Sequence, residues 1–202
     1  MARSERGLDR LVNFSDATVA IAITLLILPL VEAANDLGTE SVVAFAGAHL
    51  GLVIAFAVSF YVIGLFWLQH HRFFEAVDDY THTVLVLNLL WLAGIVFIPF
   101  VANAVSVTSG ERRDVDLLYI ATLLVVAGSL AAIEVVYSRH RELLRSLDAL
   151  DLLAAGTPVV ALVLAGVVSS FVPGGLLWLL LLIPGNVVEG WLRKRWRGRA
   201  AT

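Results

Sequence analysis

Hydrophobic residues along the chain fall into six long blocks, and short polar segments separate them. Each block approaches the roughly 20 residues that a helix needs to cross the hydrocarbon core of a bilayer. Helices are favoured because a backbone in lipid must satisfy its own hydrogen bonds. The pattern predicts an all-α membrane protein of one domain, 1–202, with six transmembrane helices. The predicted spans are about 11–34, 42–68, 84–105, 115–137, 152–172 and 176–192.

The composition supports this prediction and excludes several classes of protein. Hydrophobic residues make up 59% and charged residues 15% of the chain, whereas soluble domains average about 45–50% and about 25%. The chain has no cysteine, which excludes disulfides, thiolate metal sites and cysteine nucleophiles. It also has no HExxH sequence or phosphate-binding loop. We therefore expect neither an enzyme nor a bound metal or cofactor.

Basic residues are distributed unevenly over the two predicted membrane faces. With six spans, both termini lie on one side. That side collects all of the 14 Lys and Arg residues except Arg112 and Arg113. The positive-inside rule then predicts cytoplasmic N- and C-termini in a multi-pass protein of the cell membrane. The basic tail WLRKRWRGR is expected to contact anionic headgroups of the lipid bilayer, and we expect no nucleic-acid partner.

The first predicted span has two distinct faces when its residues are placed at about 100° per residue. One sector carries Phe14, Ile21, Leu25, Leu28 and Glu32, with Thr18 and Thr24 beside it. Copies of this helix around an axis would stack Ile21, Leu25 and Leu28 as apolar rings, which can restrict ion flow by dewetting. Thr24 would be the polar residue of such a pore, and Glu32 would form an acidic outer mouth. Ordinary helix packing is the alternative explanation of the apolar residues.

Asp16 lies on a different side of the same span and needs a partner, because an unpaired carboxylate within a membrane is costly. The candidate partners near the same membrane face are Arg10, His70, His71 and His82. We expect a polar network there that fixes the rotation of the first span and so aims Ile21 at the axis. Adjacent histidines point in different directions on a helix, so hydrogen bonding explains His70 and His71 better than joint metal coordination.

These residues resemble the signature of a known family. Arg10-x-x-x-Phe14-Ser15-Asp16 is similar to the RxxxFSD sequence of the bacterial homologues of transmembrane protein 175, the endosomal/lysosomal potassium channel. Further similar segments lie along the first three spans. They are Ala20-Ile21-Ala22-Ile23-Thr24, Leu28-Pro29, Trp67-x-x-His70-His71, Asn88-Leu89-Leu90 and Pro99-Phe100.

The resemblance implies a passive cation channel that prefers K⁺, built from four subunits around a central pore lined by the first helix. By position, it implies Ile21, Leu25 and Leu28 as the apolar constriction and Thr24 as the polar pore residue. It also implies that Asp16 and a histidine after the second span are structural partners. We expect the full structural network to comprise Arg10, Phe14, Ser15, Asp16, His70 and His71.

Two other functions stay open at this point. A proton-linked transporter would need an acid on the transport path and, usually, repeated halves with broken helices. The mid-chain break that the sequence shows is Pro184-Gly185, expected to kink the sixth span. It has no counterpart, which disfavours a transporter, whereas proton permeation through the same pore is a second alternative. An intramembrane enzyme that uses Asp16 and a histidine has no supporting motif.

Overall fold

The structure is a computed structural model that describes residues 2–35, 38, 41–107 and 112–145. These residues form α1 (Ala2–Leu25), α2 (Leu28–Ala34), α3 (Val42–Ala48), α4 (Leu50–Phe74), α5 (His82–Val107), α6 (Arg113–Arg139) and the 3₁₀ turn η1 (Arg141–Leu143). Within them, four stretches are long and apolar enough to cross a membrane: Arg6–Ala34, Leu50–Phe74, His82–Val107 and Arg113–Arg139. The protein is thus an all-helical, multi-pass membrane protein. The predicted spans 152–172 and 176–192, with the predicted kink at Pro184, lie outside the described residues.

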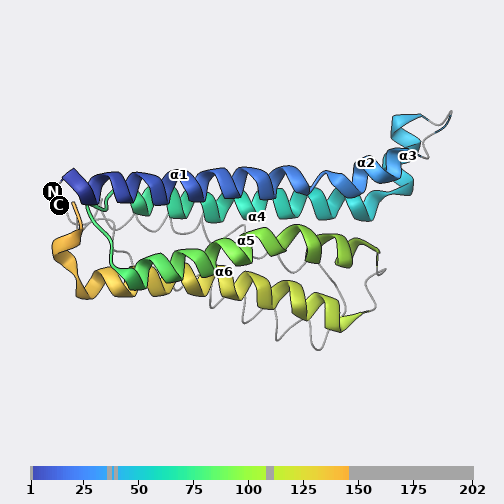
Figure 1. Ribbon diagram of the computed structural model, residues 1–202. Helices are drawn as coiled ribbons and strands as arrows, with labels where there is room; N and C mark the ends of the chain where they lie inside the picture. Colours follow the sequence, from blue (N-terminus) through green and yellow to red (C-terminus); the bar gives the residue numbers. More distant parts are fainter. Residues whose placement is uncertain (1, 36–37, 39–40, 108–111, 146–202) are drawn as a thin grey trace, which may run out of the picture.

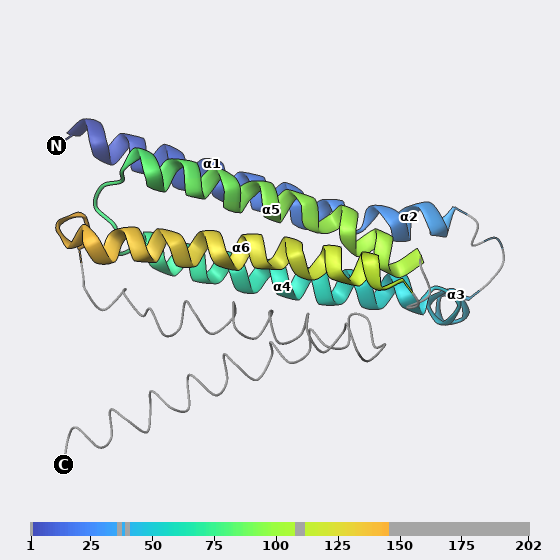
Figure 2. The same cartoon turned by 90° about the horizontal axis from the view of Figure 1, so that it is seen from below.

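The four long helices form one elongated bundle (Figure 1). α5 contacts α1, α4 and α6, whereas α1 contacts α4 and α5. A second view shows α1 beside α5 and α6 beside α4 (Figure 2). The N-terminus, the start of α5 and the end of α6 lie at one end of the bundle, which we call the N-terminal end; α2 and α3 lie at the far end. α1 therefore occupies a corner of the bundle and packs through one side.

The buried side of α1 is a continuous stripe. Its members recur every three or four residues: Leu8, Leu11, Ser15, Val19, Ala22 and Leu26. This spacing places them on one helix face. The helix begins well before the predicted Leu11 because Leu8 and Leu11 join a cluster with Phe73 and Tyr137 at the N-terminal end of the bundle. Burial of these two leucines extends the helical periodicity into the charged N-terminal segment.

The first two predicted spans are each broken, although the sequence pattern suggested single helices. α1 ends at Leu25 and α2 begins at Leu28, with Pro29 in its first turn. Proline lacks a backbone donor and clashes with the carbonyl four residues earlier, here that of Leu25. The second span is divided at His49 into α3 and α4. Gly47 and Gly51 flank this break and are weak helix formers.

The later predictions agree more closely with the structure. The predicted spans 84–105 and 115–137 correspond to α5 and α6, each two residues longer at both ends. α4 continues beyond the predicted end at Leu68 to Phe74. After η1, the backbone pairs with this loop: Asp78 N donates to Leu143 O at 2.9 Å, and Arg145 N donates to Ala76 O at 2.8 Å.

α5 and α6 approach closely at Gly94, a buried glycine of α5. A Cβ at this position would lie 2.6 Å from Val126 Cγ2 of α6. Such a separation is far below van der Waals contact, and a valine in a helix has little rotamer freedom with which to give way. The close packing of α5 on α6 therefore requires a residue without a side chain at position 94.

Gly94→Ala is expected to lower the free energy of unfolding by about 1–3 kcal/mol, the usual cost of overpacking a core. Gly128→Ala on α6 is the matched control, since a Cβ there meets nothing within 4 Å. Denaturation in detergent micelles, followed by tryptophan fluorescence, measures both variants. Equal stability of the two variants would contradict the close α5–α6 contact.

Candidate functional site

A buried chain of hydrogen bonds ties α1 to α4 and α5. Asn88 Nδ2 of α5 donates to Ser15 Oγ of α1 at 2.9 Å, and Asn88 Oδ1 lies 2.8 Å from His70 Nε2 of α4. Ser15 and His70 are fully buried, and Asn88 is 2% exposed. We call this set the Ser15–Asn88–His70 network. Because its three members come from three helices, it fixes their depth and rotation relative to one another.

The directions of these hydrogen bonds determine the protonation of His70. Ser15 Oγ donates its single proton to Leu11 O at 2.9 Å, so it accepts from Asn88. The amide oxygen of Asn88 then faces His70 and must accept, so His70 Nε2 carries a proton and donates. The second nitrogen, Nδ1, is buried without a hydrogen-bond partner. The hydrogen-bond directions thus place a proton on His70 Nε2.

Aromatic rings enclose His70 on both sides. Its ring stacks on Trp91 with centroids 4.2 Å apart and an interplanar angle of 16°. Phe74 covers it at a centroid separation of 4.4 Å. These ring contacts hold the imidazole in the orientation in which Nε2 faces Asn88.

Asp16 has a different partner from those that the sequence suggested. Its Oδ1 accepts a hydrogen bond of 2.9 Å from Trp67 Nε1 of α4. None of the suggested candidates, Arg10, His70, His71 and His82, donates this hydrogen bond. Trp67 and His70 are three residues apart, so one face of α4 reaches both Asp16 and the Asn88 amide. Two neighbouring polar contacts thus fix α1 against α4.

His71 packs beside Trp67 and is not a member of the Ser15–Asn88–His70 network. Its ring stacks on Trp67 with centroids 5.2 Å apart. Its Nε2 lies 3.4 Å from Glu75 Oε1, in an exposed pair one turn further along α4. The structure thus separates the two adjacent histidines. His70 forms a hydrogen bond with Asn88, whereas His71 stacks on Trp67, which donates a hydrogen bond to Asp16.

The remaining predicted network residues lie apart from these contacts. Arg10 is exposed and, in the described part of the chain, forms no ion pair. Phe14 is 58% exposed. His82 begins α5 and is exposed. The described residues contain no group of three His, Cys, Asp or Glu side chains that could hold a metal ion.

The side of α1 that faces away from the bundle carries the predicted pore residues. Ile21 is 61%, Leu28 47% and Leu25 39% exposed. Glu32 is also exposed. The Thr24 hydroxyl donates to Ile21 O at 2.7 Å, as Thr18 does to Phe14 O at 2.8 Å. Ile21, Thr24 and Leu25 of α1 and Leu28 and Glu32 of α2 thus lie outside the intrasubunit core.

Sequence reasoning missed Trp67 as the partner of Asp16 and did not connect Asn88 with His70. The spacing Trp67-x-x-His70 was a usable signal, because residues three apart share a helix face. The depth of α5 relative to α1 could not be predicted from the sequence, because it depends on how far each helix extends at the N-terminal end of the bundle. Only the assembled bundle brings Asn88 to the same level as Ser15.

Together, the bundle and its network define a polytopic helical membrane protein whose first helix is fixed in rotation and leaves an apolar face uncovered. Comparison with known proteins shows which family this chain resembles. Residues 10–99 match the sequence model of the family described as the endosomal/lysosomal potassium channel TMEM175. This segment contains the whole network and the exposed face of α1.

Similar proteins carry two kinds of name. A potassium channel of Streptomyces collinus is 38% identical over 91 residues, which cover 45% of this chain and 44% of that protein. A potassium channel of Chamaesiphon minutus is 36% identical over 99 residues, 48% of each chain. The endosomal/lysosomal proton channel TMEM175 of Mus musculus is 33% identical over 113 residues, 52% of this chain and 23% of that protein. The matched segments thus span less than half of each relative.

The fold has a solved counterpart. The crystal structure of a lysosomal potassium-selective channel TMEM175 homolog from Chamaesiphon minutus aligns with a TM-score of 0.69 and 22% sequence identity. The alignment covers 95% of this chain and 98% of that chain. Residues 10–99 thus match the TMEM175 family model, and the fold of the chain is similar to that of this solved homolog.

Proposed function

We propose that this protein is one subunit of a passive cation channel that prefers K⁺ over other monovalent cations. Four copies assemble around an axis in the lipid bilayer, and α1 of each copy lines the pore. Ile21, Leu25 and Leu28 form the apolar constriction, Thr24 provides a polar contact, and Glu32 attracts cations at one mouth. The protein is not an enzyme in this proposal, and it uses no cofactor.

The observation that carries the proposal is the exposed apolar face of α1. Ile21 is 61% exposed although the helix is held tightly on its other side by the buried stripe and the Ser15–Asn88–His70 network. Because the network and the stripe fix the rotation of α1, every copy of the subunit presents the same apolar face. Fixed rotation is useful where one face must meet copies of itself.

The names of the relatives support the choice of ion. Two bacterial relatives are named potassium channels. The mouse relative is named a proton channel, which makes proton permeation through the same pore the second candidate function. Both candidates need the same apolar constriction, so an ion-flux measurement separates them.

The arrangement of basic residues supports an orientation. In the described part of the chain, the helix ends and loop at the N-terminal end of the bundle carry Arg6, Arg10, Arg72, Arg139, Arg141 and Arg145, whereas the far end carries Arg112 and Arg113. The positive-inside rule places the first group in the cytoplasm. We therefore propose a multi-pass protein of the cell membrane with cytoplasmic termini and six spans in a single domain.

Purified protein in liposomes tests the proposal. We expect K⁺ to flow down its gradient without ATP, with a flux that exceeds the Na⁺ flux and does not require a proton gradient. Obligatory exchange of K⁺ for protons would reject the channel. A proton flux that exceeds the K⁺ flux would favour the second candidate. Cross-linking in detergent should give four subunits, and a monomer would reject the shared pore.

A further inference from the structure

The two parts of the first span are held very differently. α1 buries five residues of the stripe, with Leu26 following at the joint, and it belongs to the Ser15–Asn88–His70 network. α2 has no buried residue, and its main neighbour is the beginning of α4. The α1 part is thus fixed to the bundle, whereas few apolar contacts restrain α2.

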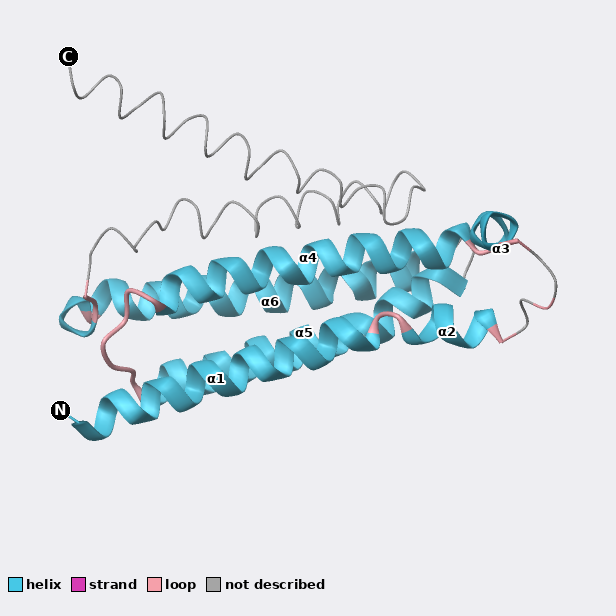
Figure 3. Cartoon of the chain, turned by 90° about the horizontal axis from the view of Figure 1, so that it is seen from above, coloured by secondary structure: helices cyan, strands magenta, loops and turns pink. Residues whose placement is uncertain are grey.

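The joint between them has the geometry of a hinge. Leu26 N donates to Ile23 O at 3.3 Å, and Ile27 N donates to Thr24 O at 3.4 Å, which are long bonds of the 3₁₀ type. A 3₁₀ stretch within a helix often marks a functional hinge. Pro29 follows and removes one further backbone donor. Figure 3 shows this joint as a loop between two helical segments.

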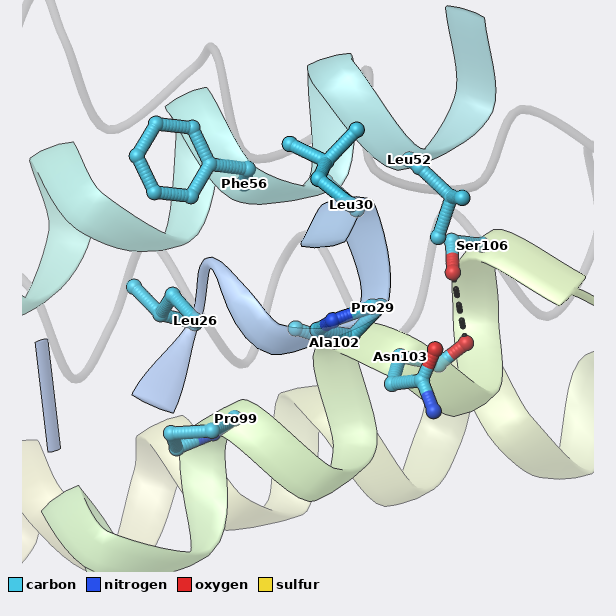
Figure 4. Close-up of a pocket in the computed structure, with 10 residues that line it drawn as sticks. Leu26, Pro29, Leu30, Leu52, Phe56, Pro99, Ala102, Asn103 and Ser106 are labelled. Atoms are coloured by element: carbon cyan, nitrogen blue, oxygen red, sulfur yellow. Dashed lines mark hydrogen bonds between the residues drawn. The ribbon is translucent and has the colours of Figure 1, made fainter. Parts of the chain in front are cut away.

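A small pocket lies directly behind the joint, between α2, α4 and α5. It is lined by Leu26, Pro29, Leu30, Phe56, Pro99 and Asn103, among others (Figure 4). The pocket places Pro29 opposite Pro99, a proline inside α5. Two proline rings thus line one small pocket at the level of the joint.

We propose that Leu26 and Ile27 are a hinge about which α2 pivots while α1 stays fixed. Leu25 is the last residue of α1 and Leu28 the first of α2, so the hinge divides the exposed apolar face. Ile21 and Leu25 keep their positions, and Leu28 and Glu32 move. If the proposed function is correct, on which this consequence rests, Ile21 sets selectivity and the pivoting α2 opens and closes one mouth of the pore.

Distances within one subunit test the hinge without reference to conduction. The chain has no cysteine, so introduced thiols can be spin-labelled selectively. The pair Glu32→Cys and Leu68→Cys measures α2 against α4. The pair Asn13→Cys and Ile54→Cys measures α1 against α4 over a similar span, about 25 Å from the helical rise. All four positions are exposed. Labelled chains are diluted into unlabelled ones, so that only distances within a subunit contribute.

The expected result is a distance distribution at least twice as wide for the Glu32–Leu68 pair as for the Asn13–Ile54 pair. Pro29→Ala should narrow the Glu32–Leu68 distance distribution to the width of the Asn13–Ile54 distribution, because alanine restores a continuous helix. Pro99→Ala, the control on α5, should leave both widths unchanged. Equal widths in the parent protein, or the same narrowing from either proline substitution, would overturn the hinge.

Liposome flux then tests the consequence for the pore. Pro29→Ala should change the K⁺ flux at least threefold and leave the ratio of K⁺ to Na⁺ permeability unaltered. A narrowed distribution with parental flux would show that the hinge exists but does not gate. Absence of flux in every variant would reject the proposed function, while the distances would still decide the hinge.

Discussion

Ile21→Asn is expected to raise the K⁺ flux through reconstituted protein by about tenfold and to reduce the preference for K⁺ over Na⁺. A ring of isoleucines at the axis resists wetting, and an amide in the same place holds water. A tenfold increase corresponds to a barrier lowered by about 1.4 kcal/mol. Ile21 is 61% exposed in the subunit, so the substitution should leave the bundle stable. Flux assays with K⁺ and Na⁺ gradients measure both effects.

Ile54→Asn is the matched control for this experiment. Ile54 is an exposed isoleucine on α4, outside the proposed pore, and the chemical change is identical. Parental flux in Ile54→Asn together with increased flux in Ile21→Asn would support the assigned face. Parental flux and selectivity in a folded Ile21→Asn protein would show that another side of α1, or another helix, lines the pathway.

Asn88→Val is expected to reduce the free energy of unfolding by about 2–4 kcal/mol. The change leaves the buried His70 Nε2–H without an acceptor, which costs about 1–3 kcal/mol. It also removes an interhelical hydrogen bond to Ser15, worth about 1 kcal/mol in a membrane protein. Trp67 and Trp91 lie beside the network, so their fluorescence during denaturation reports the loss directly.

Asn103→Val on the same helix is the control. Asn103 is exposed, and the hydrogen bond that it accepts from Ser106 Oγ involves its backbone oxygen, not its side chain. Adding His70→Phe to Asn88→Val should recover much of the lost stability, since both partners are then apolar. Equal stability losses for Asn88→Val and Asn103→Val would contradict the role of the network. A recovered double variant with reduced K⁺ flux would show that the network sets rotation of α1 rather than stability alone.

The prolines show how far the sequence could predict the helices. Pro29 and Pro99 both stand inside long apolar blocks, yet α1 breaks before Pro29 and α5 continues through Pro99. The local penalty is the same for both residues. The difference is tertiary: α5 is packed on α1, α4 and α6, whereas α2 buries nothing. Contacts along α5 compensate for its missing hydrogen bond, and α2 lacks such contacts.

Asp16 shows the same limit for the candidate site. Its charge and position indicated that a partner was required, and a cationic partner was the natural expectation. The structure provides Trp67 instead, at 2.9 Å, because the rotation of α4 presents this indole to α1. Charge alone cannot reveal that rotation, which depends on packing along the whole helix.

The sequence by itself determined the membrane class and the approximate positions of the first four spans, and it divided α1 into two faces without deciding which of them packs. These properties follow from block length and from the helical period, which are local. Only the tertiary structure decided which residues bond across helices, that His70 and not His71 joins Asn88, and that the first span is two segments. Those features depend on the relative depth and rotation of α1, α4 and α5, which arise only when the helices are packed together.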